Sequence, residues 1–170
     1  DERYARRSFQ WFHPTHFVIT NLYRDQLTRN GHPEWVYDAI LPAIHPDTTL
    51  VLNADDPLVS CFARGHEKVK WFGLDECSVS TKEHHGVYHD GARCPACQGR
   101  MEYDCYHYEH IGHYRCADCG HHRHDADFSV TALDLEGGTL VLDGETEIAL
   151  AFKSIYNVYN ILAAWSVCSL

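Results

Sequence analysis

The sequence predicts an α/β fold with a mostly parallel sheet, into which a four-cysteine zinc ribbon is inserted. Two observations support this prediction. Apolar runs typical of buried strands alternate with segments of helical spacing over residues 17–73, which is the pattern of a parallel sheet with helical crossovers. Two C-x-x-C pairs then lie within residues 82–127, a segment rich in histidine, tyrosine and glycine. We therefore expect a sheet domain that carries one small metal-held insert.

Residues 1–81 form the first part of the predicted sheet domain. Residues 1–10 are polar and basic and suit a short helix or a connecting segment. Pro33 suits the first turn of a helix, and apolar side chains follow it at helical spacing. The expected helices cover 33–44 and 58–64, and the expected buried strands cover 17–22, 50–53 and 69–73.

The pattern changes in residues 82–127, which we interpret as a zinc ribbon inserted into the sheet domain. This segment holds few aliphatic residues, so a bound metal would supply the folding free energy that a core of its own cannot. The expected short strands are 87–88, 101–103 and 112–115.

Residues 128–170 return to the sheet domain. Alternating apolar and polar side chains predict a strand over 128–135, and two shorter strands should follow at 139–142 and 147–152. Such an antiparallel meander often edges a mixed sheet. Residues 156–165 have the pattern of a helix.

The spacing of the two C-x-x-C pairs predicts a structural zinc site. Residues 98–115 separate the pairs, a distance within the range of four-thiolate zinc sites. Each pair turns two sulfurs toward one point, and four thiolates leave no coordination position open. Gly99 and Gly120 suit the positive φ that a metal knuckle needs. Two disulfides, or a redox-active pair, are the alternatives. The expected ligands are Cys94, Cys97, Cys116 and Cys119.

Composition excludes several classes of function. A formal net charge of −10 argues against a ribbon that grips nucleic acid, because phosphate binding needs a basic face. No apolar run reaches the ~18–20 residues that a membrane span needs. Most of the 14 histidines lie between His84 and His124, and we expect them to be solvated polar residues rather than ligands. Cys61 and Cys168 are expected in the core.

Four features in one order resemble the Mur-ligase family. T-N-L-Y-R-D-Q-L at 20–27 resembles the family's T-N-x-x-x-D-H-x-x-R segment, and N-A-D-D at 53–56 matches a second one. Y-N-V-Y-N-I-L-A-A at 156–164 resembles the H-N-x-x-N-A-x-A-A start of a helix. With the ribbon between the last two, the combination is similar to one branch of the family, the MurT subunits of lipid II isoglutaminyl synthase. The resemblance spans nearly the whole chain and implies that the sheet domain is a Mur-ligase central domain.

The resemblance also implies a nucleotide site. Asn157 and Asn160 match the asparagines that hold adenine, and an amide offers the donor and acceptor that an adenine edge needs. Asn21, Asp25 and Gln26 match the loop near the nucleotide phosphates and magnesium. Most Mur ligases have histidine near the second metal at the position of Gln26, so this departure weakens the case for that metal contact.

Asn53 and Asp55 match a strand end that lines the same cleft. Their alternative role is to cap the turn, for which asparagine and aspartate are well suited. No counterpart of the family's carbamylated lysine is evident in residues 34–44, which fits the MurT branch.

Two parts of a complete ligase would lie outside these residues. No G-x-x-x-x-G-K-[ST] loop occurs in the sequence. By the resemblance, this loop would precede Asp1 and the C-terminal ligase domain would follow Leu170. We therefore expect a truncated central domain that is inactive alone.

The resemblance implies an ATP-dependent reaction at the cytoplasmic face of the membrane. The full-length protein would amidate the α-carboxylate of D-glutamate in lipid II to D-isoglutamine, with Mg²⁺, using ammonia from a GatD-type glutaminase partner. The alternatives are a non-catalytic zinc-ribbon binding module and another Mur-type ligase, such as a folylpolyglutamate-type enzyme that adds an amino acid. Nucleotide binding distinguishes the first alternative, and the chemistry of the acceptor distinguishes the second.

Overall fold

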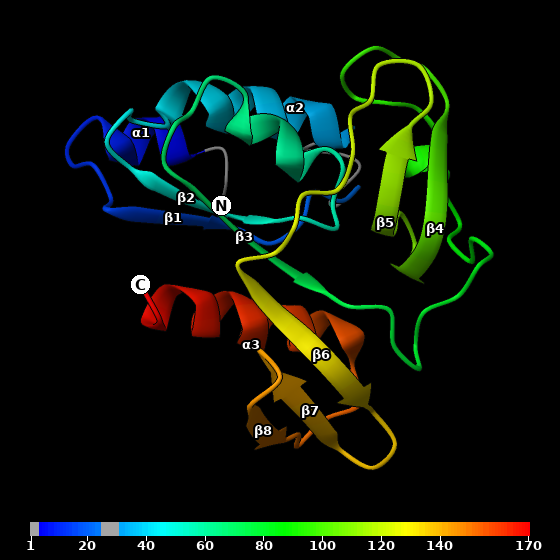
Figure 1. Cartoon of the computed structure of the whole chain (residues 1–170). Coiled ribbons are helices and arrows are strands. Elements are labelled where there is room, and N and C mark those ends of the chain that lie inside the picture. Colours follow the sequence, from blue (N-terminus) through cyan, green and yellow to red (C-terminus); the bar gives the residue numbers. More distant parts are fainter. Residues whose placement is uncertain (1–3, 25–30) are drawn as a thin grey trace.

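The protein is built on a six-stranded mixed sheet (Figure 1), here described from a computed structural model over residues 4–24 and 31–170. The strand order is β1-β2-β3-β6-β7-β8. The first four strands in that order are parallel, and β7 and β8 add antiparallel to the edge. The strands are β1 (His16–Ile19), β2 (Thr49–Asn53), β3 (Val69–Leu74), β6 (Phe128–Asp134), β7 (Thr139–Leu142) and β8 (Thr146–Ala149). The predicted fold class and the antiparallel meander are confirmed.

Helices cover both faces of the sheet. The long helix α3 (Ile155–Cys168) lies on one face, opposite α1 (Ala5–Phe9) and α2 (Pro33–Ile40), as Figure 1 shows. The 3-10 turns η3 (Leu41–Ala43) and η4 (Val59–Ala63) lie on the same side as α2.

Strand β2 shows how the two faces are filled. Side chains alternate along a strand, so Leu50 and Leu52 pack with α2 and η4 while Val51 packs with α3. All three side chains are fully buried. A strand buried on both faces has a continuous apolar sequence, which explains the run at 50–52.

Local elements differ from the expectation in several places. The first strand ends at Ile19, not at residue 22, because the Leu22 amide is bonded to the Asp56 side chain instead of a strand. The helix expected over 33–44 is α-helical only to Ile40 and continues as a 3-10 turn at Pro42, whose ring restricts the preceding residue. The helix expected over 58–64 is instead the 3-10 turn Val59–Ala63. The strand expected over 147–152 is β8, which ends at Ala149.

The segment between β3 and β6 forms a separate antiparallel hairpin at the end of the sheet toward which β3 points (Figure 1). Its strands are β4 (Met101–Tyr108) and β5 (Ile111–Cys116), preceded by the turn η5 (Asp90–Ala92). The strands expected at 101–103 and 112–115 are therefore confirmed and are longer. The strand expected at 87–88 is wrong: Val87 is 86% exposed and pairs with no strand.

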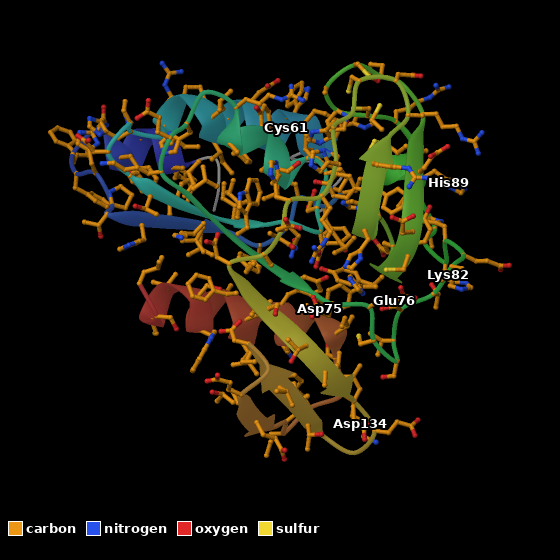
Figure 2. All side chains as sticks on the ribbon, viewed as in Figure 1. Cys61, Asp75, Glu76, Lys82, His89 and Asp134 are labelled. Carbon is orange, nitrogen blue, oxygen red and sulfur yellow. The ribbon has the colours of Figure 1, made fainter. Side chains whose placement is uncertain are left out.

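Figure 2 shows the side chains that fill the space between this hairpin and the sheet. At the outer side of the junction, Glu76 and Lys82 form an exposed ion pair with an N–O distance of 2.7 Å. Among the described residues, no helix is long and apolar enough to cross a membrane.

Candidate metal centre and nucleotide-binding edge

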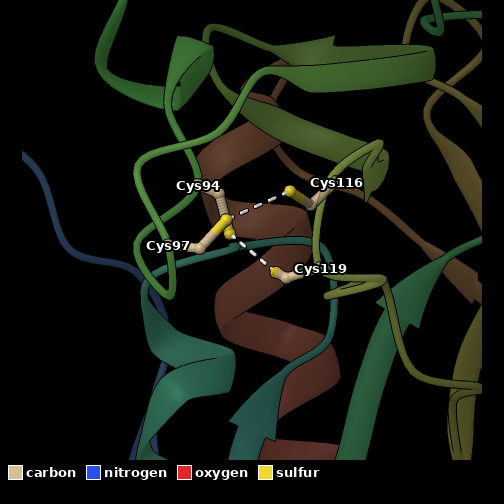
Figure 3. Close-up of side chains that lie close together, drawn as sticks. All are labelled: Cys94, Cys97, Cys116 and Cys119. Carbon is tan, nitrogen blue, oxygen red and sulfur yellow. Dashed lines mark hydrogen bonds between the residues drawn. The ribbon is translucent and has the colours of Figure 1, made fainter.

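The four predicted cysteines converge on one point at the end of the hairpin (Figure 3). Their sulfur atoms all lie within 4.8 Å of one another. Cys94 Sγ and Cys119 Sγ are 3.6 Å apart, as are Cys97 Sγ and Cys116 Sγ. A disulfide needs about 2.05 Å, so these are four free thiols arranged as a tetrahedral zinc site requires.

The first cysteine turn has the amide-to-sulfur hydrogen bonds of a metal knuckle. The amide of Ala96 donates to Cys94 Sγ at 3.3 Å, and the amide of Gly99 donates to Cys97 Sγ at 3.3 Å. Gly120 has a φ of +75°, which confirms the need for glycine after the second pair. In the first turn the positive φ of 63° falls on Gln98 and not on Gly99.

The thiols differ in how readily they lose a proton. The backbone amide of Cys119, aided by that of Asp118, lowers the pKa of Cys116 to about 7. At Cys97 the Gly99 amide lowers the pKa, but neighbouring thiols and burial outweigh it and raise the pKa to about 12. One thiolate therefore forms readily, and a bound cation would favour ionisation of the others. The donor set and geometry fit zinc.

Asp55 does not line a cleft as the family resemblance implied. Its carboxylate is fully buried and accepts hydrogen bonds from three donors. These are Arg123 Nε at 2.6 Å, the Leu74 amide at 2.7 Å and the Tyr159 hydroxyl at 2.7 Å. Its backbone carbonyl also accepts from the Gly112 amide of β5 at 2.9 Å. Asp55 therefore joins the sheet, α3 and the hairpin.

Asp56 makes a second buried connection of the same kind. Its carboxylate accepts from the amides of Leu22, Leu58 and Val59 at 2.9–3.1 Å. His110 Nε2 of the hairpin lies 3.8 Å from Asp56 Oδ2. Both carboxylates of the N-A-D-D segment thus serve the packing of the hairpin against the sheet.

Asn53 caps the turn after β2, the role expected as the alternative to lining a cleft. Its Oδ1 accepts from the Asp55 amide at 3.0 Å, and its Nδ2 donates to the Thr20 carbonyl at 2.8 Å. These bonds fix the turn after β2 and tie it to the end of β1. The side chain is fully buried and is not presented to a ligand.

The remaining predicted nucleotide residues lie at separate places on this edge. Asn157 and Asn160 are exposed in the first turns of α3, where Asn160 Nδ2 lies 3.4 Å from Asn157 Oδ1. Asn21 is half-buried just after β1 and bonds only weakly to Thr20, at 3.5 Å. Asp25 and Gln26 lie outside the described residues.

A row of aromatic rings links the loop after β1 to the start of α3. Tyr23 stacks on Tyr108 of the hairpin with centroids 5.9 Å apart, and Tyr108 meets Tyr156 edge-on at 4.8 Å. The hairpin thus fills the space between the two segments that carry Asn21 and Asn157.

Several residues of this edge were not foreseen. His107 and His110 are buried rather than solvated, and Cys168 is exposed rather than in the core, whereas Cys61 is buried as expected. Arg123 has no local sequence signal, because its partner is 68 residues away. Tyr159 does have a local sequence signal, because it lies three residues before buried Leu162 on the apolar face of the helix.

The chain is similar in sequence to enzyme subunits of one name from two bacteria. It is 35% identical, over 98% of its length, to the MurT subunit of lipid II isoglutaminyl synthase (glutamine-hydrolyzing) from Streptococcus pneumoniae. It is 29% identical, again over 98% of its length, to the subunit of the same name from Staphylococcus aureus. The chain spans 38% of the length of each of these relatives.

The fold is also similar to that of a solved peptide ligase. A pseudomurein peptide ligase type C from Methanothermus fervidus matches 96% of this chain and 33% of its own, with a TM-score of 0.74 and 27% identity. No protein-family model matches the chain.

Proposed function

Because the chain is homologous to MurT subunits of lipid II isoglutaminyl synthase along 98% of its length, we propose that it forms the central part of an ATP-dependent ligase of peptidoglycan synthesis. The full-length protein would amidate the α-carboxylate of D-glutamate in lipid II to D-isoglutamine. Residues 82–127 would be a zinc-ribbon insert between two parts of the ligase domain, 1–81 and 128–170. This proposal rests on one observation: the alignment with these relatives covers 98% of this chain.

The proposed nucleotide site lies at the carboxyl edge of the parallel sheet, where ligands of open α/β sheets bind. Asn157 and Asn160 would hold adenine. Their side-chain amides are exposed and bond to no buried group, so they are accessible to a ligand. Asn21, at the end of β1, would lie near the phosphates together with Asp25 and Gln26. Mg²⁺ would neutralise phosphate charge at this loop when bound.

The proposed chemistry overcomes the poor reactivity of a free carboxylate. The substrate carboxylate would attack the γ-phosphorus of ATP, which releases ADP and leaves an acyl phosphate. Ammonia from a glutaminase subunit of the GatD type would then attack the acyl carbon and expel phosphate. Work on a lipid-linked substrate would take place at the cytoplasmic face of the membrane.

The zinc would have a structural role in this function. Four thiolates occupy every position of a tetrahedral zinc and leave none for substrate. The cysteines close the end of the hairpin, and the hairpin contacts Asp55 through the Gly112 amide and Asp56 through His110. Zinc would thereby hold one wall of the nucleotide-binding edge in place.

Reconstitution of the full-length protein with its glutaminase subunit tests the proposal. We expect amidated lipid II, detected by mass spectrometry of the stem peptide, only when ATP, glutamine and both subunits are present. Addition of an amino acid in place of ammonia would identify another Mur-type ligase. If the full-length protein bound no adenine nucleotide, it would instead be a non-catalytic module.

A further inference from the structure

The hairpin carries a second cluster of metal-binding side chains, separate from the four cysteines. Cys105 and His107 come from β4, and His113 is the partner of Cys105 on β5. The sulfur and one nitrogen from each imidazole lie within 4.8 Å of one another. The ligand atoms of the four-cysteine centre lie within the same distance of one another.

The cluster lies inside the protein, between the hairpin and the end of β3. Cys105 and the side chain of His107 are fully buried, and His113 is half-buried. The pairing of β4 and β5 shifts register between Tyr106 and Tyr108. A shift of this kind often redirects a side chain, and here it falls on His107.

His107 has a buried nitrogen without a hydrogen-bond partner. Its Nδ1 lies 2.9 Å from Ser80 Oγ, whereas its Nε2 has no partner among the described residues. In one tautomer Nε2 is an unpaired donor, and in the other it is an unpaired lone pair. Either state of a fully buried group is costly. A metal ion would satisfy the lone pair.

The other ring nitrogens are arranged as those of metal-bound histidines usually are. His113 Nε2 lies 2.8 Å from the Leu74 carbonyl oxygen, which can only accept. Nε2 therefore carries the proton, and Nδ1 is left with a free lone pair. His107 Nδ1 can donate to Ser80 in the same way. A ligating histidine typically donates its second ring N–H to a carbonyl or other acceptor, which fixes its orientation.

We propose that Cys105, His107 and His113 bind a second zinc ion. One thiolate and two imidazoles are a donor set that suits Zn²⁺. The carboxylate of Asp55, which is paired with Arg123, lies beside the cluster with its Oδ2 4.0 Å from His107 Nε2. This zinc fastens the middle of the hairpin to the end of β3, whereas the four-cysteine zinc closes the open end, where β4 begins and β5 ends. The inference does not depend on the ligase activity.

Metal content of the purified protein tests the proposal. We expect about two zinc ions per chain in the wild type, one for each ligand cluster, and about one in Cys105→Ala. Cys61→Ala removes another buried thiol, outside both clusters, and should retain both ions. In the same way, His113→Gln should lose one ion while His110→Gln, at a buried histidine of the same hairpin, should keep two. About one zinc per chain in the wild type would overturn the proposal.

X-ray absorption of the zinc-loaded wild type tests the same proposal without a variant that has to fold. A four-cysteine site alone gives only sulfur neighbours, at about 2.3 Å. A second site of this composition adds nitrogen neighbours at about 2.0–2.1 Å, with the outer-shell scattering of imidazole. Pure sulfur coordination would refute the second site. A copper ion in the cluster would refute its assignment to zinc.

Discussion

Arg123 and Asp55, 68 residues apart in the chain, form a buried ion pair with an Nε–Oδ1 distance of 2.6 Å. Arg123 follows the second cysteine pair, and Asp55 follows β2. Arg123 also donates to the Leu74 carbonyl at 3.1 Å. The pair therefore connects the segment that carries the zinc cysteines to the carboxyl ends of two central strands.

Replacing Arg123 with alanine should strongly destabilise the protein. Removal of one partner leaves the Asp55 charge buried and uncompensated, which typically costs about 3–5 kcal/mol. Urea denaturation measures the loss. Arg115→Ala is the matched control, because Arg115 pairs with Glu102 on the exposed side of the same hairpin. Such exposed pairs contribute about 0–1 kcal/mol, so equal losses in the two variants would contradict the prediction.

Removing one zinc ligand should release the metal and weaken the hairpin. We expect Cys97→Ala to contain about one zinc ion fewer per chain than the wild type, since three thiolates no longer complete the closed site. Its thermal unfolding should begin at a lower temperature. Cys168→Ser changes an exposed thiol outside the cluster and should alter neither result. Undiminished zinc in Cys97→Ala would show that the sulfurs do not share a metal.

Backbone conformation in the two knuckles predicts opposite effects of two substitutions. Gln98 has a left-handed φ of 63°, which costs a residue with a Cβ about 1–2 kcal/mol. Gln98→Gly should therefore stabilise the protein. The gain is reduced because glycine loses more conformational entropy on folding than glutamine does. Gly120→Ala should destabilise it by about 1 kcal/mol, because φ there is +75°. Chemical denaturation of the zinc-loaded variants checks both signs, and stabilisation by Gly120→Ala would be inconsistent with the structure.

Stability should depend on pH through His110. Burial lowers the pKa of His110, but the Asp56 carboxylate outweighs burial and raises it above the ordinary value. A histidine whose pKa is higher in the folded state stabilises fully below its unfolded pKa of about 6.5. This contribution is lost as pH rises through the folded pKa. The free energy of unfolding should therefore fall more in the wild type than in His110→Gln between about pH 6 and pH 9. Parallel profiles would exclude this linkage.

Substitution of the two exposed asparagines on α3 should affect nucleotide binding but not folding. In the full-length protein, Asn157→Ala and Asn160→Ala should each weaken ATP binding about two- to tenfold, the equivalent of one lost hydrogen bond. Isothermal titration measures the affinity, and the melting temperature should not change because both side chains are exposed. Ser169→Ala, at the other end of the helix, is the control. Unaltered affinity in both asparagine variants would place adenine elsewhere.

The sequence predicted those parts of the fold that have a local pattern. β2 and β3 lie within one residue of the expected ranges. In β2 the reason is that residues 50–52 are buried on both faces and are therefore all apolar. The zinc cysteines were identified for a similar reason, since their spacing follows from the metal geometry itself. The strand expected at 87–88 rested on only two residues, without a partner strand, and it does not exist.

The roles of Asp55 and Asp56 could not be predicted from local sequence. An acidic residue after a strand has the same local pattern whether it caps a turn, binds a ligand or meets a buried cation. For Asp55, the partners that decide between these roles, Arg123 and Tyr159, are 68 and 104 residues away. The burial of His107 likewise depends on how the hairpin packs against β3.

The contacts of Asp55 and Asp56 limit how this protein can be engineered. An insert joined to its host only through its two ends can be replaced by a short loop with little harm. Here a deletion of residues 82–127 would also remove Arg123 and the Gly112 amide, which bond to Asp55. It would remove His110, which lies beside Asp56. Both aspartates belong to the sheet domain. A ribbon-free version of the sheet would therefore need an uncharged residue in place of Asp55, whose buried charge would lose Arg123. Asp56 would keep the amides of Leu22, Leu58 and Val59.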